Sequence, residues 1–142
     1  AGTVTWTFCG SELPGTYAVR ASGFYQTVPG VRHNYALPET AFEVRPMATR
    51  TRLTDTRLGQ GRYRLTALVR QQAERGFERA EGIPVRLERR GPTGWHRVRG
   101  LPLTTVDGRA ATTVTRPGAY RAVVRPSGNH DASMSQVVTL GR

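Results

Sequence analysis

Arg62-Tyr-Arg-Leu-Thr-Ala-Leu-Val-Arg70 is the stretch that decides the fold. Its apolar side chains Tyr63, Leu65, Ala67 and Val69 stand two residues apart, and Arg or Thr fills most of the positions between them. Successive side chains of a strand point to opposite faces of a sheet, so the apolar residues share one face and the polar residues share the other. This stretch therefore predicts a half-buried β-strand.

The same spacing recurs along the chain in short runs that are bounded by Gly, Pro, Asp or Ser. This pattern is typical of antiparallel strands joined by turns, and the glycines at 59–61 and 107–108 are placed where such turns are needed. The one helix candidate, residues 71–79, has no continuous apolar stripe and is interpreted as a long loop. The sequence predicts an all-β protein with strands at 3–8, 16–25, 41–45, 49–54, 62–70, 83–89, 95–99, 109–115, 119–125 and 135–140.

Two segments that are far apart in the chain share one pattern. Leu13-Pro-Gly-Thr-Tyr-Ala-Val and Arg116-Pro-Gly-Ala-Tyr-Arg-Ala-Val each place a Pro-Gly turn just before a Tyr that opens a strand. Pro14 and Pro117 are 103 residues apart (117 − 14), which is about the length of one sandwich domain. We expect each Tyr ring to cover the end of a sheet and its hydroxyl to reach a nearby backbone group.

Five motifs follow one another between residues 48 and 142. They are Arg62-Tyr-Arg-Leu, Ile83-Pro-Val-Arg-Leu-Glu-Arg-Arg, Gly94-Trp-His-Arg-Val, Thr104-Thr-Val-Asp-Gly-Arg-Ala and Pro117-Gly-Ala-Tyr-Arg-Ala-Val. In order and spacing they resemble the immunoglobulin-like, or fibronectin type III-like, repeats found in tandem in secreted and cell-surface proteins of high-GC bacteria. The resemblance implies an immunoglobulin-like β-sandwich, and a role as a spacer, a stalk, or a protein- or carbohydrate-binding accessory.

The sequence predicts one complete domain preceded by a partial one. Residues 47–142 contain all five motifs, and we expect a complete sandwich there. Residues 1–46 match only the last strands of such a repeat. A few strands alone are marginally stable, which leaves three explanations: the chain is a fragment of a longer protein, another chain supplies the early strands, or the segment adds sheet to the second domain. We favour the first two, because an open edge invites strand pairing with another chain or with a missing N-terminal part.

The basic residues set up a strong positive field. All 21 Lys and Arg positions are Arg, and the formal net charge is +11. Such a field attracts polyanions without a specific site. Because the arginines alternate with apolar residues, most are interpreted as solvated outer faces in a composition typical of GC-rich coding sequence. The alternative is a site for a nucleic acid or an acidic polysaccharide, formed by Arg50, Arg52, Arg64, Arg86, Arg89 and Arg90.

No set of residues makes a convincing active site. Cys9 is the only cysteine, so the chain forms no internal disulfide. No His has a partner at metal-ligand spacing, and Asn129-His130-Asp131 is interpreted as a turn whose polar side chains bond their own backbone. There is no nucleophile elbow or phosphate loop. The sequence therefore predicts a non-enzymatic protein with no cofactor and no metal.

Aromatic residues near a predicted loop at 28–38 are the best candidates for a contact surface. Phe24, Tyr25 and Tyr35 lie beside Gly, Pro and Asn, and apolar side chains near loops commonly mark a partner site. Trp6 and Trp95 are interpreted as core aromatics, and the alternative is that they are exposed platforms for sugar binding. We expect the ligand to be a protein or a carbohydrate.

The resemblance to immunoglobulin-like repeats of secreted and surface proteins implies a location at the cell surface or in the extracellular space. No apolar run approaches the roughly 18 residues that span a bilayer. The first residues, Ala1-Gly-Thr-Val-Thr, lack the basic flank and apolar stretch of a signal peptide. We expect the export signal to have been removed or to belong to a longer precursor.

Overall fold

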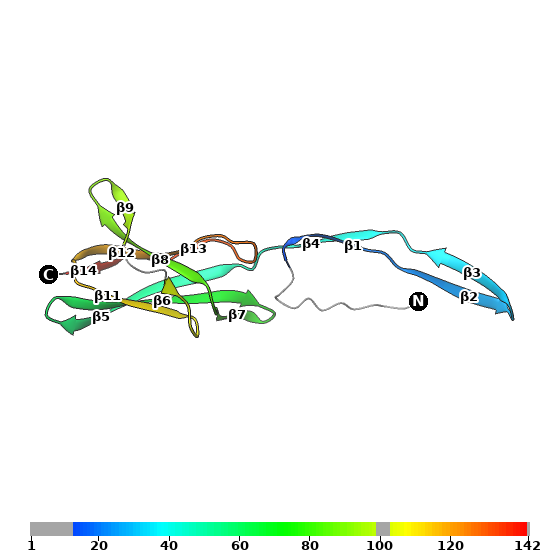
Figure 1. Cartoon of the computed structure of the whole chain (residues 1–142), viewed down its shortest axis with the longest axis horizontal. Coiled ribbons are helices and arrows are strands. Elements are labelled where there is room, and N and C mark those ends of the chain that lie inside the picture. The colour runs from blue at the N-terminus through cyan, green and yellow to red at the C-terminus, as the bar shows by residue number, and fades with distance from the viewer. Residues whose placement is uncertain (1–12, 99–102, 142) are drawn as a thin grey trace. The chain divides into compact units, whose positions relative to one another are not determined.

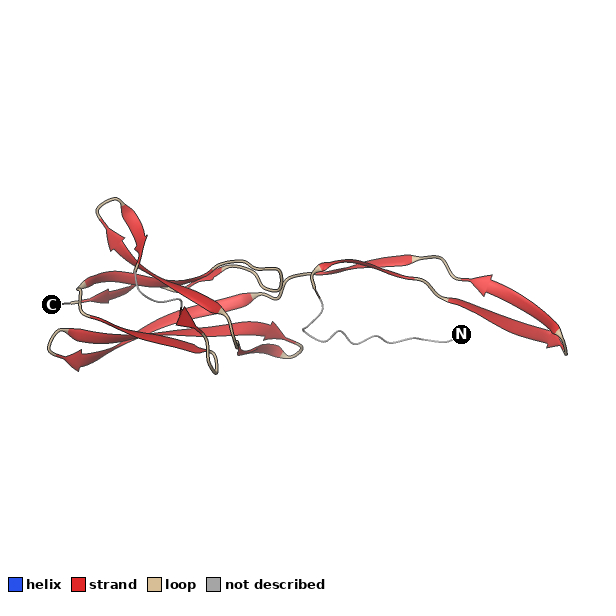
Figure 2. Ribbon diagram, viewed as in Figure 1, coloured by secondary structure: helices blue, strands red, loops and turns tan. Residues whose placement is uncertain are grey.

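A computed structural model describes residues 13–98 and 103–141 (Figure 1). All regular secondary structure in these residues is β-strand, and the strand pairs are antiparallel (Figure 2). The all-β prediction is therefore confirmed. The strand predicted at 3–8, together with Trp6 and Cys9, lies outside the described residues.

The chain divides into two compact units, Ala1–Arg45 and Pro46–Arg142. The division falls one residue before the predicted boundary. The assignment of either unit to an immunoglobulin-like repeat stays a prediction.

The described residues of the second unit, 46–98 and 103–141, form two sheets. One has the order β10-β8-β12-β13, with β9 paired to β8 and β14 paired to β12. Its strands are β8 (Pro84–Gly91), β9 (Gly94–Arg97), β10 (Leu103–Thr104), β12 (Gly118–Val124), β13 (Ser133–Met134) and β14 (Val138–Leu140). The other has the order β11-β6-β5, with β7 paired to β6. Its strands are β5 (Thr49–Gly59), β6 (Arg62–Ala73), β7 (Gly76–Arg79) and β11 (Arg109–Val114).

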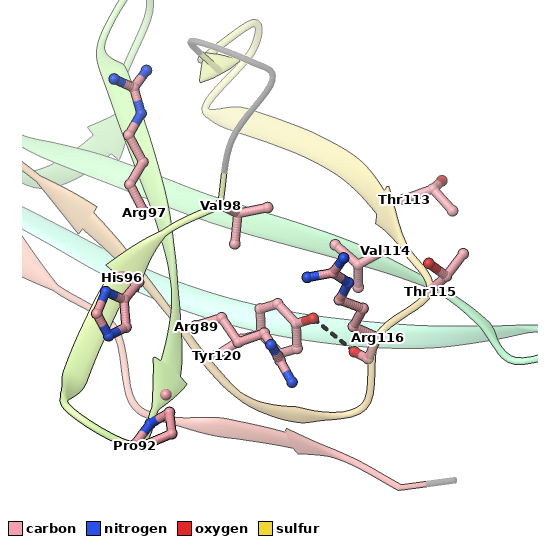
Figure 3. Close-up of a pocket in the computed structure, with 11 residues that line it drawn as sticks. Arg89, Pro92, His96, Arg97, Val98, Thr113, Val114, Thr115, Arg116 and Tyr120 are labelled. Atoms are coloured by element: carbon pink, nitrogen blue, oxygen red, sulfur yellow. Dashed lines mark hydrogen bonds between the residues drawn. The ribbon is translucent and has the colours of Figure 1, made fainter.

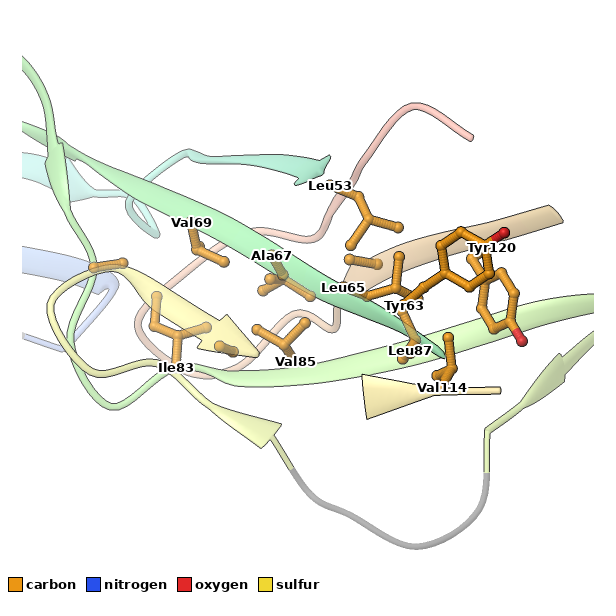
Figure 4. Close-up of a cluster of buried hydrophobic side chains, with 14 of the residues drawn as sticks. Leu53, Tyr63, Leu65, Ala67, Val69, Ile83, Val85, Leu87, Val114 and Tyr120 are labelled. Atoms are coloured by element: carbon orange, nitrogen blue, oxygen red, sulfur yellow. The ribbon is translucent and has the colours of Figure 1, made fainter. Parts of the chain in front are cut away.

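Side chains from both sheets form one hydrophobic cluster (Figure 4). Leu53, Leu65 and Val69 come from one sheet, Tyr120 and Val124 come from the other, and each is no more than 1% exposed. Burying a Leu or Val side chain contributes about 1.5–3 kcal/mol. The alternation predicted for residues 62–70 is confirmed, because its apolar members face this cluster and its arginines face outward.

Hairpin turns occur where the sequence places flexible residues. Gln60 and Gly61 connect β5 to β6, and Asp107 and Gly108 precede β11. All four have positive φ, from 50° at Gln60 to 72° at Gly108. Gly tolerates this region without strain, and Asp tolerates it better than most residues. The turns predicted at 59–61 and 107–108 are confirmed.

Residues 71–79 are not a loop, and that prediction is wrong. β6 continues to Ala73, the chain turns, and β7 pairs back from Gly76. Gly76 has a φ of 116°, which permits this reversal. Phe77 on β7 lies beneath the guanidinium of Arg50, 3.9 Å from its carbon. The Arg50 side chain thus covers the Phe77 ring, although residues 71–79 have no continuous apolar stripe of their own.

Residues 13–45, the described part of the first unit, form two short ribbons. β1 (Gly15–Val19) pairs with β4 (Thr40–Val44), and β2 (Ser22–Val28) pairs with β3 (Val31–Ala36). The strand predicted at 16–25 is therefore divided between β1 and β2. The loop predicted at 28–38 is wrong, because β3 occupies most of it after a turn at Gly30, which has a φ of 84°.

The Tyr residues of the two similar segments make the same hydrogen bond. Tyr17 donates from its hydroxyl to the Leu13 carbonyl at 2.6 Å, and Tyr120 donates to the Arg116 carbonyl at 2.7 Å. The expectation that each hydroxyl reaches a nearby backbone group is confirmed. In each case the acceptor is four residues upstream, across the Pro-Gly turn.

The strand pairing around Tyr17 also matches the strand pairing around Tyr120. Tyr17 is opposite Phe42, and Gly15 is opposite Val44. In the second unit, Tyr120 is opposite Val138, and Gly118 is opposite Leu140. A Gly-x-Tyr segment is thus paired with an apolar-x-apolar segment in both units.

Candidate functional site

One face of the β2–β3 ribbon is aromatic. Tyr25 is directly opposite His33, and Gly23 is directly opposite Tyr35. Directly opposite residues share a face, so Tyr25, His33 and Tyr35 lie together. The rings of Tyr25 and His33 stack, with centroids 4.9 Å apart and planes 15° apart. His33 Nε2 is 3.1 Å from Thr27 Oγ1, and this hydrogen bond orients the imidazole.

Tyr35 lies across Gly23. A Cβ atom added at Gly23 would be 2.7 Å from the Tyr35 hydroxyl oxygen, so the glycine makes room for the ring. Tyr25 is 54% exposed and Tyr35 is 49% exposed. We call Tyr25, His33 and Tyr35 the aromatic face. The stacked rings of Tyr25 and His33 and the Tyr35 ring beside Gly23 are exposed to solvent. This arrangement is typical of a contact surface rather than of a core.

The predicted contact residues lie on one ribbon but not on one face. Phe24 points to the side opposite Tyr25, and the guanidinium carbon of Arg32 is 3.6 Å from its ring centroid. The structure therefore brings Tyr25 and Tyr35 together and separates Phe24 from them. His33 and Gly23 were not among the predicted contact residues. The signal available for them was the alternation of side chains on either side of Pro29-Gly30.

The six arginines of the predicted polyanion site are distributed over two sheets. Arg50, Arg52 and Arg64 are at outward positions of β5 and β6. Arg86 and Arg90 are at outward positions of β8. Arg89 is at an inward position near the strand end, where its Nε donates to the Pro117 carbonyl at 3.2 Å. The structure does not bring these six residues together as one site.

Strand pairing adds other arginines beside Arg50, Arg52 and Arg64. Arg70 of β6 is opposite both Arg50 and Arg79. Leu68, two residues before it, is opposite both Arg52 and Arg109. The result is an exposed surface that we call the arginine face: Arg50, Arg52, Arg64, Arg70, Arg79 and Arg109.

Asp107 is the acidic partner at the edge of the arginine face. Its carboxylate accepts hydrogen bonds from Arg79 at 2.6 and 2.7 Å. The hydrogen bond from Arg79 is the main reason that the pKa of Asp107 is lowered. The carboxylate of Glu81 accepts from the Asp107 backbone N–H at 2.6 Å and fixes the turn. Asp107 thus neutralises one arginine of the face.

Arg121 on the other sheet is in a different environment. It forms a partly buried ion pair with Glu88 at 2.8 Å, and its guanidinium lies 4.3 Å from the centroid of Trp95. Trp95 is opposite Arg90 in the β8–β9 hairpin and is half-buried. The interpretation of Trp95 as a core residue is wrong, because β9 extends one edge of the sheet and Trp95 is covered there by Arg121.

A basic depression lies where the β8–β9 hairpin approaches the turn before β12 (Figure 3). Its volume is roughly 660 Å³. Arg89, His96, Arg97 and Arg116 are among its described lining residues, and no carboxylate is among them. Burial raises the pKa of the Tyr120 hydroxyl at its base, although the charges of Arg89 and Arg116 act in the opposite direction.

Asn129-His130-Asp131 is held by hydrogen bonds to Ser127 and to the backbone of Met47. The Ser127 hydroxyl is 2.8 Å from His130 Nδ1 and accepts from the Asn129 backbone N–H at 3.3 Å. The Asp131 backbone N–H donates to the Met47 carbonyl at 3.0 Å. The chain bends at Gly128 and Asn129, in agreement with the predicted turn, and His130 pairs with Met47 in an isolated bridge. The side chain that bonds the backbone here is that of Ser127. Within residues 13–98 and 103–141, no three His, Cys, Asp or Glu side chains are grouped so as to hold a metal ion.

Comparison with known proteins gives no relative. No protein-family model matches the chain, and no curated protein or solved structure is significantly similar to it. Among the described residues, no helix is long and apolar enough to cross a membrane.

Proposed function

We propose that the chain is a non-catalytic extracellular module built from immunoglobulin-like repeats, which acts as a spacer and as a binding accessory. One observation carries the proposal: Tyr17 and Tyr120 make the same hydrogen bond across a Pro-Gly turn, within the same strand register. A Tyr at the start of a late strand whose hydroxyl bonds the backbone a few residues upstream is a feature of immunoglobulin-like sandwiches.

The strand order of the second unit supports the same assignment. β5, β6 and β11 would be strands A, B and E of one sheet, and β8, β12 and β14 would be strands C, F and G of the other. The chain passes between the sheets from β11 to β12, at the turn that the Tyr120 hydrogen bond closes. This is the place that such a tyrosine occupies in immunoglobulin-like sandwiches.

By the same correspondence, β1 and β4 would be the last two strands of a second repeat. The β2–β3 ribbon then occupies the connection between them, as residues 125–137 connect β12 to β14. Connections at the ends of sandwiches commonly carry the contacts of these domains. The remaining strands of this repeat would come from a neighbouring segment or from another chain.

The aromatic face fits a neutral carbohydrate. The rings of Tyr25 and His33 are nearly parallel, and the hydroxyl end of the Tyr35 ring lies close to Gly23. Such rings offer an apolar surface to the C–H face of a sugar, while the Tyr hydroxyls remain free to hydrogen-bond. Since the rings are already stacked on the ribbon, little side-chain entropy would be lost on binding.

Affinity electrophoresis in gels containing soluble neutral polysaccharides tests this contact. A β-glucan, a xylan and a mannan serve as probes. We expect retardation in at least one gel, its loss in Y25A/Y35A, and its retention in F24A, which removes an aromatic ring from the other side of the same ribbon. Equal loss in both variants would contradict the role of the aromatic face. If no gel retards the protein, the aromatic face does not bind a neutral polysaccharide, and only the spacer role of the proposal remains.

A further inference from the structure

The outer face of the β5–β6–β7–β11 sheet concentrates positive charge through strand register. Arg50, Arg70 and Arg79 form one cross-strand row, and Arg52 and Arg109 flank Leu68 in the next. Cβ atoms of directly opposite residues are about 4.5–5.5 Å apart, and same-face positions along a strand are about 7 Å apart. Five arginines therefore share a small area on one face of the sheet.

Acidic side chains do not balance this surface. The outward positions of β5, β6, β7 and β11 carry no Asp or Glu in the described chain. Asp107 at the edge forms an ion pair with Arg79, and its charge also interacts with Arg109. Asp55 and Glu78 are at the alternate positions of their strands, and Glu78 accepts a hydrogen bond from Gln71 at 3.2 Å. The charge of the other arginines remains available to a ligand.

We propose that the arginine face binds a linear acidic polysaccharide. Guanidinium groups present a planar fork of N–H donors that matches carboxylate, sulfate and phosphate oxygens in pairs. Anionic groups repeated along a polymer suit the two rows, because neighbouring groups can be bound at once. The contact of Arg50 with Phe77 holds one guanidinium across the face and reduces the entropy that binding would cost.

A polysaccharide fits this surface better than a nucleic acid. Single-stranded nucleic acids bind through exposed aromatic rings that stack on bases, whereas Phe77 is the aromatic residue of this face and lies beneath Arg50. Duplex DNA is stiff, with a persistence length of about 50 nm, and meets a sheet along a narrow line. A flexible acidic chain can follow both rows. This site belongs to the second unit, and its proposal does not depend on the proposed neutral-carbohydrate contact of the first unit.

Two triple variants of the full chain with equal charge test the proposal. R50Q/R52Q/R70Q removes three arginines from the arginine face. R86Q/R90Q/R125Q removes two arginines of β8 and the arginine that follows β12, all outside the arginine face. Both variants have a net charge of +8 (11 − 3). Binding to heparin, polygalacturonate and a DNA duplex is measured by calorimetry at several salt concentrations. Circular dichroism confirms that each variant is folded.

We expect the chain to bind at least one acidic polysaccharide. Exposed ion pairs change affinity by up to about fivefold each, so R50Q/R52Q/R70Q should bind about tenfold or more weakly. Its slope of log K against log salt should fall by about two, for three contacts at about 0.7 each on a flexible polyanion. R86Q/R90Q/R125Q should stay within about threefold of the wild type.

Three results would overturn the proposal. They are an equal loss in both triple variants, tighter binding to the DNA duplex than to either polysaccharide, and no binding to either polysaccharide at low salt. If R50Q/R52Q/R70Q does not fold, R52Q/R109Q replaces it, because these two residues flank Leu68 without contacting the core. The same comparison then applies, with R86Q/R90Q as the equal-charge control.

Discussion

Arg50 on β5 and Arg70 on β6 are direct cross-strand partners on the outward face of their sheet. Arg70 has a second partner of the same charge, Arg79, at its other side. Like charges in directly opposite positions destabilise a sheet. The row therefore costs folding free energy, and a bound polyanion would offset that cost.

Reversing the charge of Arg70 is expected to stabilise the second unit. In Arg70→Glu the side chain attracts both Arg50 and Arg79, and we expect the free energy of unfolding to rise by about 0.5–1 kcal/mol at low salt. Urea unfolding measures the change. At about 1 M salt, where the Debye length is about 3 Å, most of the gain should vanish.

Arg64→Glu is the matched control for this charge reversal. Arg64 has the neutral partners Thr56 and Thr113, so its replacement should change the free energy of unfolding by less than about 0.5 kcal/mol. Equal, salt-independent effects in the two variants would show that Arg70 experiences no repulsion.

Tyr120 is expected to limit stability at alkaline pH. Its ring is 1% exposed, and burial raises the pKa of its hydroxyl above the ordinary value of 10.0. The folded state then keeps the proton when the unfolded state loses it, so this group favours folding below pH 10 and the contribution is lost as the pH rises through the folded pKa.

The variant Tyr120→Phe tests the alkaline effect. It loses the hydrogen bond to the Arg116 carbonyl, which should reduce the free energy of unfolding at pH 7 by about 1 kcal/mol. Above pH 10 its stability should decline less steeply than that of the wild type. Chemical unfolding between pH 8 and 11 measures both effects. Parallel curves for the two proteins would rule out a contribution from this hydroxyl.

A strand could be predicted from the sequence where its own pattern of apolar residues is enough to define it. β6 was predicted because Tyr63, Leu65, Ala67 and Val69 alternate and the hydrophobic cluster needs all four. β3 was missed because its residues are all exposed. Its extended form comes from pairing with β2 rather than from a buried side, and pairing is a property of two segments.

The same limit applies to the surfaces. Arg50 and Arg70 become neighbours only through the register of β5 and β6, which the sequence of either strand does not contain. The aromatic face likewise depends on Gly23 being opposite Tyr35. Conversely, the hydrogen bonds of Tyr17 and Tyr120 could be predicted, because the Pro-Gly turn and the Tyr are within a few residues of each other.

Asp107 is expected to contribute stability that is lost in acid. The hydrogen bond from Arg79 lowers the pKa of its carboxyl below the ordinary value of 3.8. The contribution is therefore present above about pH 4 and disappears as the pH falls through the folded pKa. In Asp107→Asn, the melting temperature should fall less between pH 5 and pH 2 than in the wild type.

Asn is the suitable replacement at this position. Asp107 has a φ of 51°, and Asn tolerates the left-handed region as well as Asp does. The turn and the hydrogen bond from its backbone N–H to Glu81 should both persist. A melting temperature that falls equally in both proteins would mean that the Arg79 contact makes no difference to folding.

Gly23 is expected to position Tyr35 rather than to stabilise the fold. In Gly23→Ala, the new Cβ would lie 2.7 Å from the Tyr35 hydroxyl oxygen and 2.8 Å from its ring carbon Cζ, so the ring must swing away. Because Tyr35 is exposed, the free energy of unfolding should change by less than about 0.5 kcal/mol. Nuclear Overhauser contacts between the Tyr35 ring and residue 23 should disappear.

Gly23→Ala also tests whether polysaccharide binding depends on the position of the Tyr35 ring or only on the presence of the three rings. Gly23→Ala keeps all three rings, but its Cβ occupies the space that the Tyr35 ring needs. Retardation by a neutral polysaccharide should therefore weaken, as it does in Y25A/Y35A. Gly15→Ala is the control, since its new Cβ would meet only the Tyr17 ring, at 4.0 Å, an ordinary contact distance. If Gly23→Ala binds as tightly as Gly15→Ala after the Tyr35 ring has moved, the ligand does not stack on Tyr35, and the contact belongs to Tyr25 and His33 alone.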